Sequence, residues 1–174
     1  MDWPTQLDEF ESLIKQGRGA AVKKTLMKMS LGAVPRTHYG RLGNIATRAG
    51  YPQFTLKLFT REIKKSSFEA ADLSVLERAE YAFALTHIGA FPEAQRILER
   101  LEPSAYSKVL LYETYALFNQ WRYRDAIPQL EKFLELADDR YFHRVGRVNL
   151  CAALIFCHEH ARALDILREL EREI

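Results

Sequence analysis

The chain has 174 residues, 48% of them hydrophobic and 28% charged, and a formal net charge of +2. This composition is ordinary for a soluble globular protein, and there is no apolar run of about eighteen residues to predict a membrane span. The opening segment MDWPTQLDEFES carries acidic groups where a secretory signal needs basic ones, and two cysteines are too few for a secreted disulfide framework. We therefore expect a cytoplasmic protein.

The charges are unevenly distributed along the chain. Residues 1–65 contain twelve basic and five acidic groups, whereas the remainder contains thirteen basic and eighteen acidic groups. The interval between Glu11 and Glu62 has no acidic residue at all. A basic surface of this kind can attract an acidic protein or nucleic acid. The simpler interpretation is that these side chains lie on the solvated outer faces of helices.

Five helical hairpins are predicted in chain order, because the same apolar pattern recurs five times. The hairpins are expected at residues 3–30, 35–65, 75–102, 107–137 and 141–174. In each, a small or apolar residue opens the second helix, with leucine four positions later and apolar residues nine and fifteen positions earlier. The opening residues are Val22, Phe54, Ala94, Ala126 and Ala163. Their intervals of 32, 40, 32 and 37 residues lie around a period of about 34 that is typical of helical repeats.

The residues between the helices fit this assignment. Gly50 and Gly89 suit the backbone that ends a first helix, and Pro52, Pro92 and Pro128 lie near the start of second helices. A single hairpin cannot bury its apolar face, whereas stacked hairpins bury a continuous core and leave a concave groove. We therefore expect an all-α fold, a right-handed solenoid of about five antiparallel helical hairpins forming a single repeat domain over residues 1–174.

The segment YAFALTHIGAFPEAQRILERL resembles a unit of the tetratricopeptide repeat (TPR) family. The residues that match the turn of that family are Gly89, Phe91, Glu93 and Ala94, and Leu98 and Leu101 match the core of its second helix. The first helices are more divergent, so related helical-hairpin solenoids remain an alternative. The resemblance implies a scaffold that binds a partner protein or peptide and has no chemistry of its own, so neither enzyme activity nor a cofactor is expected.

In TPR proteins the first helix of each unit lines the concave groove, which implies a set of partner-binding residues here. The members at the groove itself are apolar or amide residues, namely Tyr39, Phe83, Tyr115, Asn119, Val148 and Ile155. The members at its margins are basic, namely Arg36, Lys108 and Arg144. The alternative for each apolar member is a place in the core between repeats. An end of the array is a second candidate binding surface.

Two other binding functions stay open. The basic region 12–61 could bind an anion or nucleic acid, although no recognition module is evident. The segment DDRYFHRVGR begins the fifth hairpin, where Asp138 and Asp139 suit the start of a helix and the arginines form an alternative anion-binding patch.

Another possible function is that of a self-assembly module, because apolar residues at helical spacing continue through Leu164 and Leu167 to Ile174 without a polar cap. This end is expected to pack on another copy, on a partner or on a continuation of the chain.

Both cysteines lie beside two histidines in the fifth hairpin, in the segment LCAALIFCHEHA. Cys151 and Cys157 are six residues apart on the predicted first helix, which rotates their side chains by about 120° from one another. His158 replaces the turn residue Gly89 of the third hairpin, and Cys151 replaces Ala82 at a tight packing position. We therefore predict a packing cysteine and an ordinary turn, and no metal site.

Overall fold

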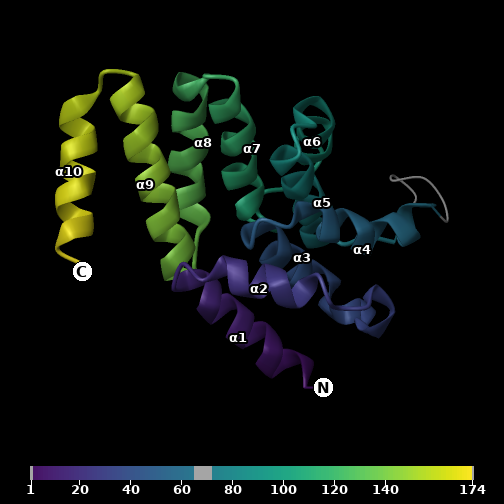
Figure 1. The fold of residues 1–174 in the computed structure, drawn as a ribbon. Coiled ribbons are helices and arrows are strands. Elements are labelled where there is room, and N and C mark those ends of the chain that lie inside the picture. Colours follow the sequence, from purple (N-terminus) through teal and green to yellow (C-terminus); the bar gives the residue numbers. More distant parts are fainter. Residues whose placement is uncertain (1, 65–71, 174) are drawn as a thin grey trace. The chain divides into compact units, whose positions relative to one another are not determined.

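The computed structural model describes residues 2–64 and 72–173, and the helices of this part form pairs (Figure 1). The α-helices are α1 (Trp3–Lys15), α2 (Gly19–Leu26), α3 (Tyr39–Arg48), α4 (Pro52–Lys64), α5 (Val75–His87), α6 (Phe91–Leu98), α7 (Lys108–Asn119), α8 (Tyr123–Leu136), α9 (Arg140–Phe156) and α10 (His160–Glu171). Short 3-10 turns at Leu31–Ala33 and Arg36–His38 precede α3. The described residues contain no strand, and the prediction of an all-α fold is confirmed.

A turn of three residues joins the two helices of every pair, and all five turns have the same backbone. The middle residue of each turn has a positive φ, between 59° and 85°. These residues are Gly17, Gly50, Gly89, Trp121 and His158. In each turn the N–H of the next residue donates to a carbonyl five residues earlier, as Ala90 does to Leu85 over 3.0 Å. This pattern is the Schellman motif, which satisfies carbonyls that the end of a helix leaves without partners.

The shared turn corrects the predicted register of the second hairpin by one residue. The opening residue lies five positions after the positive-φ residue in the other hairpins, which makes Thr55 rather than Phe54 its counterpart. The turn hydrogen bond agrees, because Tyr51 N–H donates to Ala46 and not to Ile45. Every residue from Leu42 to Thr47 is buried, so apolar spacing alone could not separate the two registers. Tyr39, predicted to line the groove, is therefore out of register, and Gly40 takes the position.

Local chemistry marks the start of three of the helices, and one proline lies elsewhere than predicted. Ser74 and Glu77 form a capping box at α5, and the Asp139 carboxylate accepts a 3.0 Å hydrogen bond from Phe142 N–H at α9. Pro52 is the first residue of α4. Pro128, by contrast, lies inside α8 rather than in its first turn.

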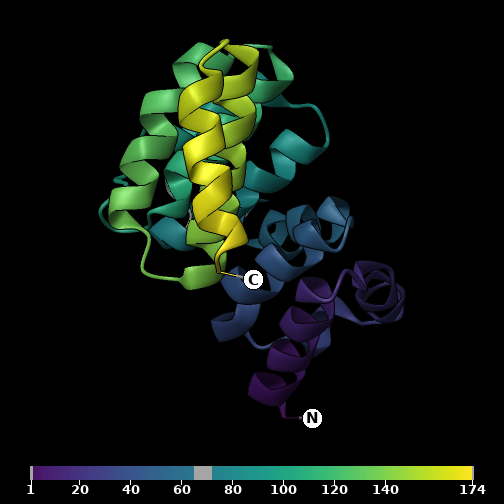
Figure 2. The same ribbon diagram turned by 90° about the vertical axis from the view of Figure 1, so that its left-hand side faces the viewer.

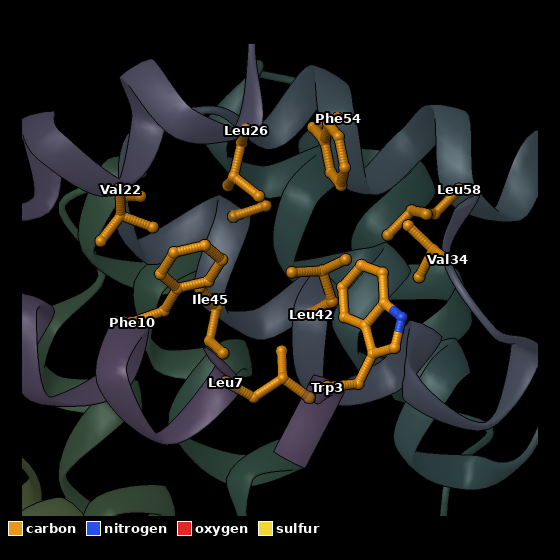
Figure 3. Close-up of a cluster of buried hydrophobic side chains, with 12 residues drawn as sticks. Trp3, Leu7, Phe10, Val22, Leu26, Val34, Leu42, Ile45, Phe54 and Leu58 are labelled. Carbon is orange, nitrogen blue, oxygen red and sulfur yellow. The ribbon is translucent and has the colours of Figure 1, made fainter. Parts of the chain in front are cut away.

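The helices form two compact units, Met1–Ile97 (unit 1) and Leu98–Ile174 (unit 2). The core of unit 1 centres on side chains from α1 to α4, among them Trp3, Leu7 and Leu26 (Figure 3). In unit 2 the core joins α7, α8, α9 and α10, with Leu130, Phe133 and Leu154 fully or almost fully buried. Whether the five hairpins act as one domain stays a prediction.

Successive hairpins within a unit pack in a repeating way. Helix α3 contacts both α1 and α2, and α5 contacts both α3 and α4. In unit 2, α9 packs against α8, and α10 packs against α9, so that α9 and α10 lie in front of the other helices of this unit in Figure 2. Within a unit, the first helix of a hairpin thus packs against the hairpin before it, as α3, α5 and α9 do. No helix in the described part of the chain is both long and apolar enough to cross a membrane.

Candidate partner-binding surface

The nine predicted groove residues are divided between the two units. Arg36, Tyr39 and Phe83 belong to unit 1, and the other six belong to unit 2. Their burial differs widely, from 5% exposed for Phe83 to 54% exposed for Val148. The predicted set therefore has to be considered residue by residue.

Arg36 is engaged within unit 1. Its guanidinium forms an ion pair with the Glu77 carboxylate, in which Nη2 donates to Oε2 over 2.9 Å. The same Nη2 donates to the carbonyl of Asp72 over 2.8 Å, and the guanidinium lies 5.2 Å from the centre of the Tyr39 ring. Glu77 is also the capping-box residue of α5. Arg36 thus fastens the segment before α3 to the start of α5, which is a structural role.

The two aromatic candidates of unit 1 also take part in packing. Tyr39 meets Phe59 edge-on, with ring centres 6.2 Å apart, and is partly buried. Phe83 is almost fully buried, and its ring meets that of His87 with centres 4.3 Å apart. The alternative role in the core therefore describes Phe83 better than a role as a partner anchor.

Three candidates at α7 are held by neighbours within unit 2. The Lys108 ammonium lies 3.4 Å from the centre of the Phe142 ring, a cation–π contact between α7 and α9. Asn119 donates from its amide to the carbonyl of Tyr115 over 2.8 Å, one turn earlier in the same helix. The Tyr115 ring packs against the core of unit 2. These contacts position α7 and leave Asn119 exposed at its end.

Arg144 and its neighbour Arg147 face the end of α10. Arg147 donates to the Glu173 carboxylate over 2.7 Å, and Arg144 donates to the carbonyl of Glu173 over 3.4 Å. The hydrogen bond from Arg147 is the main cause that lowers the pKa of Glu173 below its usual range. Asp139 caps α9 as predicted, and the arginines that follow join the two helices of the last hairpin.

Val148 and Ile155 are the apolar candidates that the structure leaves open to solvent. They are 54% and 46% exposed on α9, and on the adjacent helix α10 Leu164 and Leu167 are 51% and 42% exposed. Four large aliphatic side chains at such exposure within one hairpin are unusual for a surface that has no partner. We call these four residues the terminal face. Sequence analysis identified Val148 and Ile155 on the family pattern, and Leu164 and Leu167 through the missing polar cap.

A second exposed group, at the turns of unit 2, was not predicted. Trp121 is 76% exposed and Phe156 is 55% exposed, and the Tyr123 ring lies close to both. The Tyr123 and Phe156 rings stack with centres 4.1 Å apart and planes 7° apart. Trp121 stands nearly perpendicular to both rings, at 83° and 87°. We call these three residues the aromatic turn cluster. The sequence pattern that points to it is a tryptophan at a turn position that glycine occupies in other hairpins.

Cys151 and His158 occupy the positions that the repeat predicts, whereas Cys157, predicted on the first helix, lies just past its end. Cys151 is 3% exposed, its thiol lies 3.7 Å from the Ala163 carbonyl as a weak donor, and burial raises the pKa of this thiol. Cys157 and His158 lie in the three-residue turn, where His158 has φ of +64° as the counterpart of Gly89. Within residues 2–64 and 72–173, no three histidine, cysteine or acidic side chains are grouped to hold a metal ion.

Comparison with known proteins places the chain by its fold. No family model matches the sequence, and no curated protein matches it. Two solved structures of MamA, a TPR-like protein, match it structurally: MamA MSR-1 C2 and MamA AMB-1 C2221. Each has a TM-score of 0.54 and 18% identity, and the match covers 95% of this chain and 92% and 95% of theirs. At this identity the likeness shows the fold alone, which is TPR-like.

Proposed function

We propose that the protein is an interaction scaffold that binds a partner protein or peptide and carries out no reaction itself. TPR-like hairpins are a common framework for such binding. The observation that carries the proposal is the aromatic turn cluster, where a large apolar side chain lies in water on a strained backbone. Tryptophan and tyrosine dominate the binding energy of many interfaces because they bury a large area at low entropic cost.

Trp121 is unfavourable for the stability of the isolated chain in two ways. A left-handed conformation costs about 1–2 kcal/mol for a residue other than glycine. The three turns of unit 1 avoid this cost by using Gly17, Gly50 and Gly89. The side chain is also 76% exposed, so it gains little from burial. A residue that costs stability at a solvent-exposed position indicates a requirement of function.

The replacement Trp121→Gly tests this proposal. We expect its thermal stability to equal or exceed that of the wild type, and its capture of cross-linked partners in the native cell to fall at least tenfold. His158→Gly is the matched control, because it changes the same backbone position in the next turn and leaves the cluster intact. Equal capture by wild type and Trp121→Gly would show that the cluster is not the binding surface.

The predicted concave groove remains a second candidate surface, and its members Tyr115 and Asn119 lie near the turn that contains Trp121. A nucleic-acid or anion-binding function of region 12–61 is the main rival. Arg41 of that region donates to Glu11 over 2.8 Å and also pairs with Asp8, so part of its positive charge is neutralised. Nucleic-acid binding would fall steeply with salt concentration. A partner held through aromatic contacts would depend on salt much less.

A further inference from the structure

The terminal face is the surface that the repeat normally covers. Counting from the opening residue of each second helix, Val148 lies fifteen positions before Ala163 and Leu167 lies four after it. The first, second and fourth hairpins are each followed by another hairpin of the same unit, so the same two positions can be compared in them. They are Leu7 and Leu26 in the first, Gly40 and Phe59 in the second, and Leu111 and Leu130 in the fourth.

All six of these counterparts are buried. Leu7, Leu26 and Leu111 are 1% exposed, and Phe59 and Leu130 are 0% exposed, against 54% for Val148 and 42% for Leu167. The contrast is not one of residue type, because both sets are mainly aliphatic. The difference is that a following helix covers the first, second and fourth hairpins.

The element that covers each of these hairpins is the first helix of the next one. Helix α3 covers α1 and α2, α5 covers α3 and α4, and α9 packs against α8. Small residues bring the helices close together. A Cβ at Gly146 of α9 would lie 2.7 Å from the Phe133 ring of α8, and a Cβ at Gly40 of α3 would collide with Leu76 of α5. The chemistry that fits this kind of surface is therefore an amphipathic helix with small and aliphatic residues on one face.

We propose that the terminal face binds one amphipathic α-helix of a partner protein, laid against α9 and α10 as α9 lies against α8. This proposal rests on the proposed scaffold function and names a surface and a class of partner for it. A second copy of the chain is a poorer occupant. In the first hairpin, among the described residues, Met27 is the one large apolar side chain that is exposed, at 66%, so that end offers no matching apolar face.

Helix α9 is a ready probe, because it already occupies the equivalent surface of the fourth hairpin. Its buried residues Gly146, Leu150, Ala153 and Leu154 follow the i, i+4, i+7, i+8 spacing of one helix face. A fluorescent peptide of residues 139–157 would be titrated with the full chain. A control peptide of equal length carries Leu150→Asp and Leu154→Asp, which removes the apolar stripe.

We expect the wild-type chain to bind the α9 peptide with a dissociation constant on the order of micromolar, and the control peptide at least tenfold more weakly. The double variant Val148→Asp, Leu167→Asp should bind the α9 peptide at least tenfold more weakly than the wild type. Both side chains are largely exposed, so circular dichroism and the melting temperature should show that this variant still folds.

Three results would overturn the proposal. The first is the absence of saturable peptide binding by the wild type, and the second is equal binding by the double variant. The third is a concentration-dependent dimer in sedimentation that the double variant abolishes, which would make a second copy the occupant. Trp121→Gly should leave peptide binding unchanged. If Trp121→Gly loses partners but still binds the peptide, the aromatic turn cluster and the terminal face are separate binding surfaces. Each proposal can therefore fail without the other.

Discussion

The two units solve the same backbone problem with different residues. In all five turns the middle residue has a positive φ and donates to a carbonyl three residues earlier, and the next residue donates to a carbonyl five residues earlier. The middle residue is glycine in all three turns of unit 1, whereas it is Trp121 or His158 in unit 2. Identical hydrogen bonding shows that the turn is determined by the helical repeat and does not require glycine. The middle residue of the turn can therefore differ between the units. Glycine in unit 1 avoids backbone strain, and we propose that Trp121 in unit 2 contributes to binding.

The distribution of polar and apolar groups differs in the same direction. Among the described residues, six of the seven buried polar side chains belong to unit 1, including Glu80, whose carboxylate accepts two hydrogen bonds from the Asn44 amide. Seven of the ten exposed large apolar side chains belong to unit 2. Unit 1 thus places polar groups inside, where they fix a particular packing, and unit 2 places apolar groups outside. This contrast supports the proposal that the binding surface belongs to unit 2.

The largest expected effect comes from one truncation made at the same repeat position in both units. Leu26→Ala should lower the free energy of unfolding by about 2–5 kcal/mol, because it opens a cavity at a side chain that is 1% exposed. Leu167→Ala should cost less than about 1 kcal/mol, because that side chain is 42% exposed. Urea denaturation followed by circular dichroism measures both. Equal losses would mean that the terminal face is covered within the folded chain.

A smaller effect concerns a single carboxyl group of unit 2. Burial, with a contribution from nearby Glu99, raises the pKa of Glu113 to about 7, and Lys132 partly offsets this. The folded state therefore favours the neutral acid. The contribution of Glu113 to stability should therefore be fully present below about pH 4.5, the ordinary pKa of this group, and should be lost as the pH rises through about 7.

The replacement Glu113→Gln should remove this pH dependence and stabilise the protein at pH 8 by about 1–2 kcal/mol, after allowance for solvent screening. Glu99→Gln is the matched control and should shift the transition only slightly to lower pH. Denaturation midpoints measured between pH 4 and 8 would check both. A variant with the same pH profile as the wild type would show that Glu113 ionises normally.

The fold could be predicted from the sequence because apolar spacing, small opening residues and turn length recur along the chain. His158 was predicted to replace Gly89 in its turn, and its positive φ confirms this. The register of the second hairpin was wrong because α3 is buried on nearly all sides, so its sequence has no polar face to mark the orientation. A Schellman hydrogen bond fixes that register, and it depends on the turn rather than on the apolar pattern.

The binding surface was less predictable, because the role of a side chain depends on partners distant in sequence. Arg36 is paired with Glu77, forty-one residues away, and no local pattern announces that pair. Val148 and Ile155 were identified correctly as residues on a first helix, but only the structure shows that the described residues of unit 2 leave them about half exposed. Trp121 was not predicted because tryptophan, unlike glycine, does not indicate a positive φ from its residue type.

Substitutions at the turns should have opposite signs in the two units, each by about 1 kcal/mol. Gly50→Ala should destabilise the protein, although no atom lies within 4 Å of the added Cβ, because alanine is strained at φ of +77°. His158→Gly should stabilise it by relieving the same strain at φ of +64°. Thermal melting of the two single variants and the double variant gives both values. If both variants are less stable, the histidine contributes contacts that outweigh its strain.

The smallest effect tests how the basic half of the chain is held together. Arg41 of α3 joins Asp8 and Glu11 of α1, so it links the first two hairpins of unit 1 across thirty residues or more. Because the guanidinium is 38% exposed, solvent screens these pairs, and Arg41→Gln should cost about 0.5–1 kcal/mol. Raising the salt concentration from 0.05 to about 1 M should reduce this difference. Arg122→Gln is the matched control, because Arg122 pairs with Asp125 three residues later at the start of α8 and so links no two helices. If Arg122→Gln lowers the free energy of unfolding more than Arg41→Gln does, charge pairing between helices is not what holds α1 to α3. The apolar contacts of Leu7 and Leu42 would then be the cause.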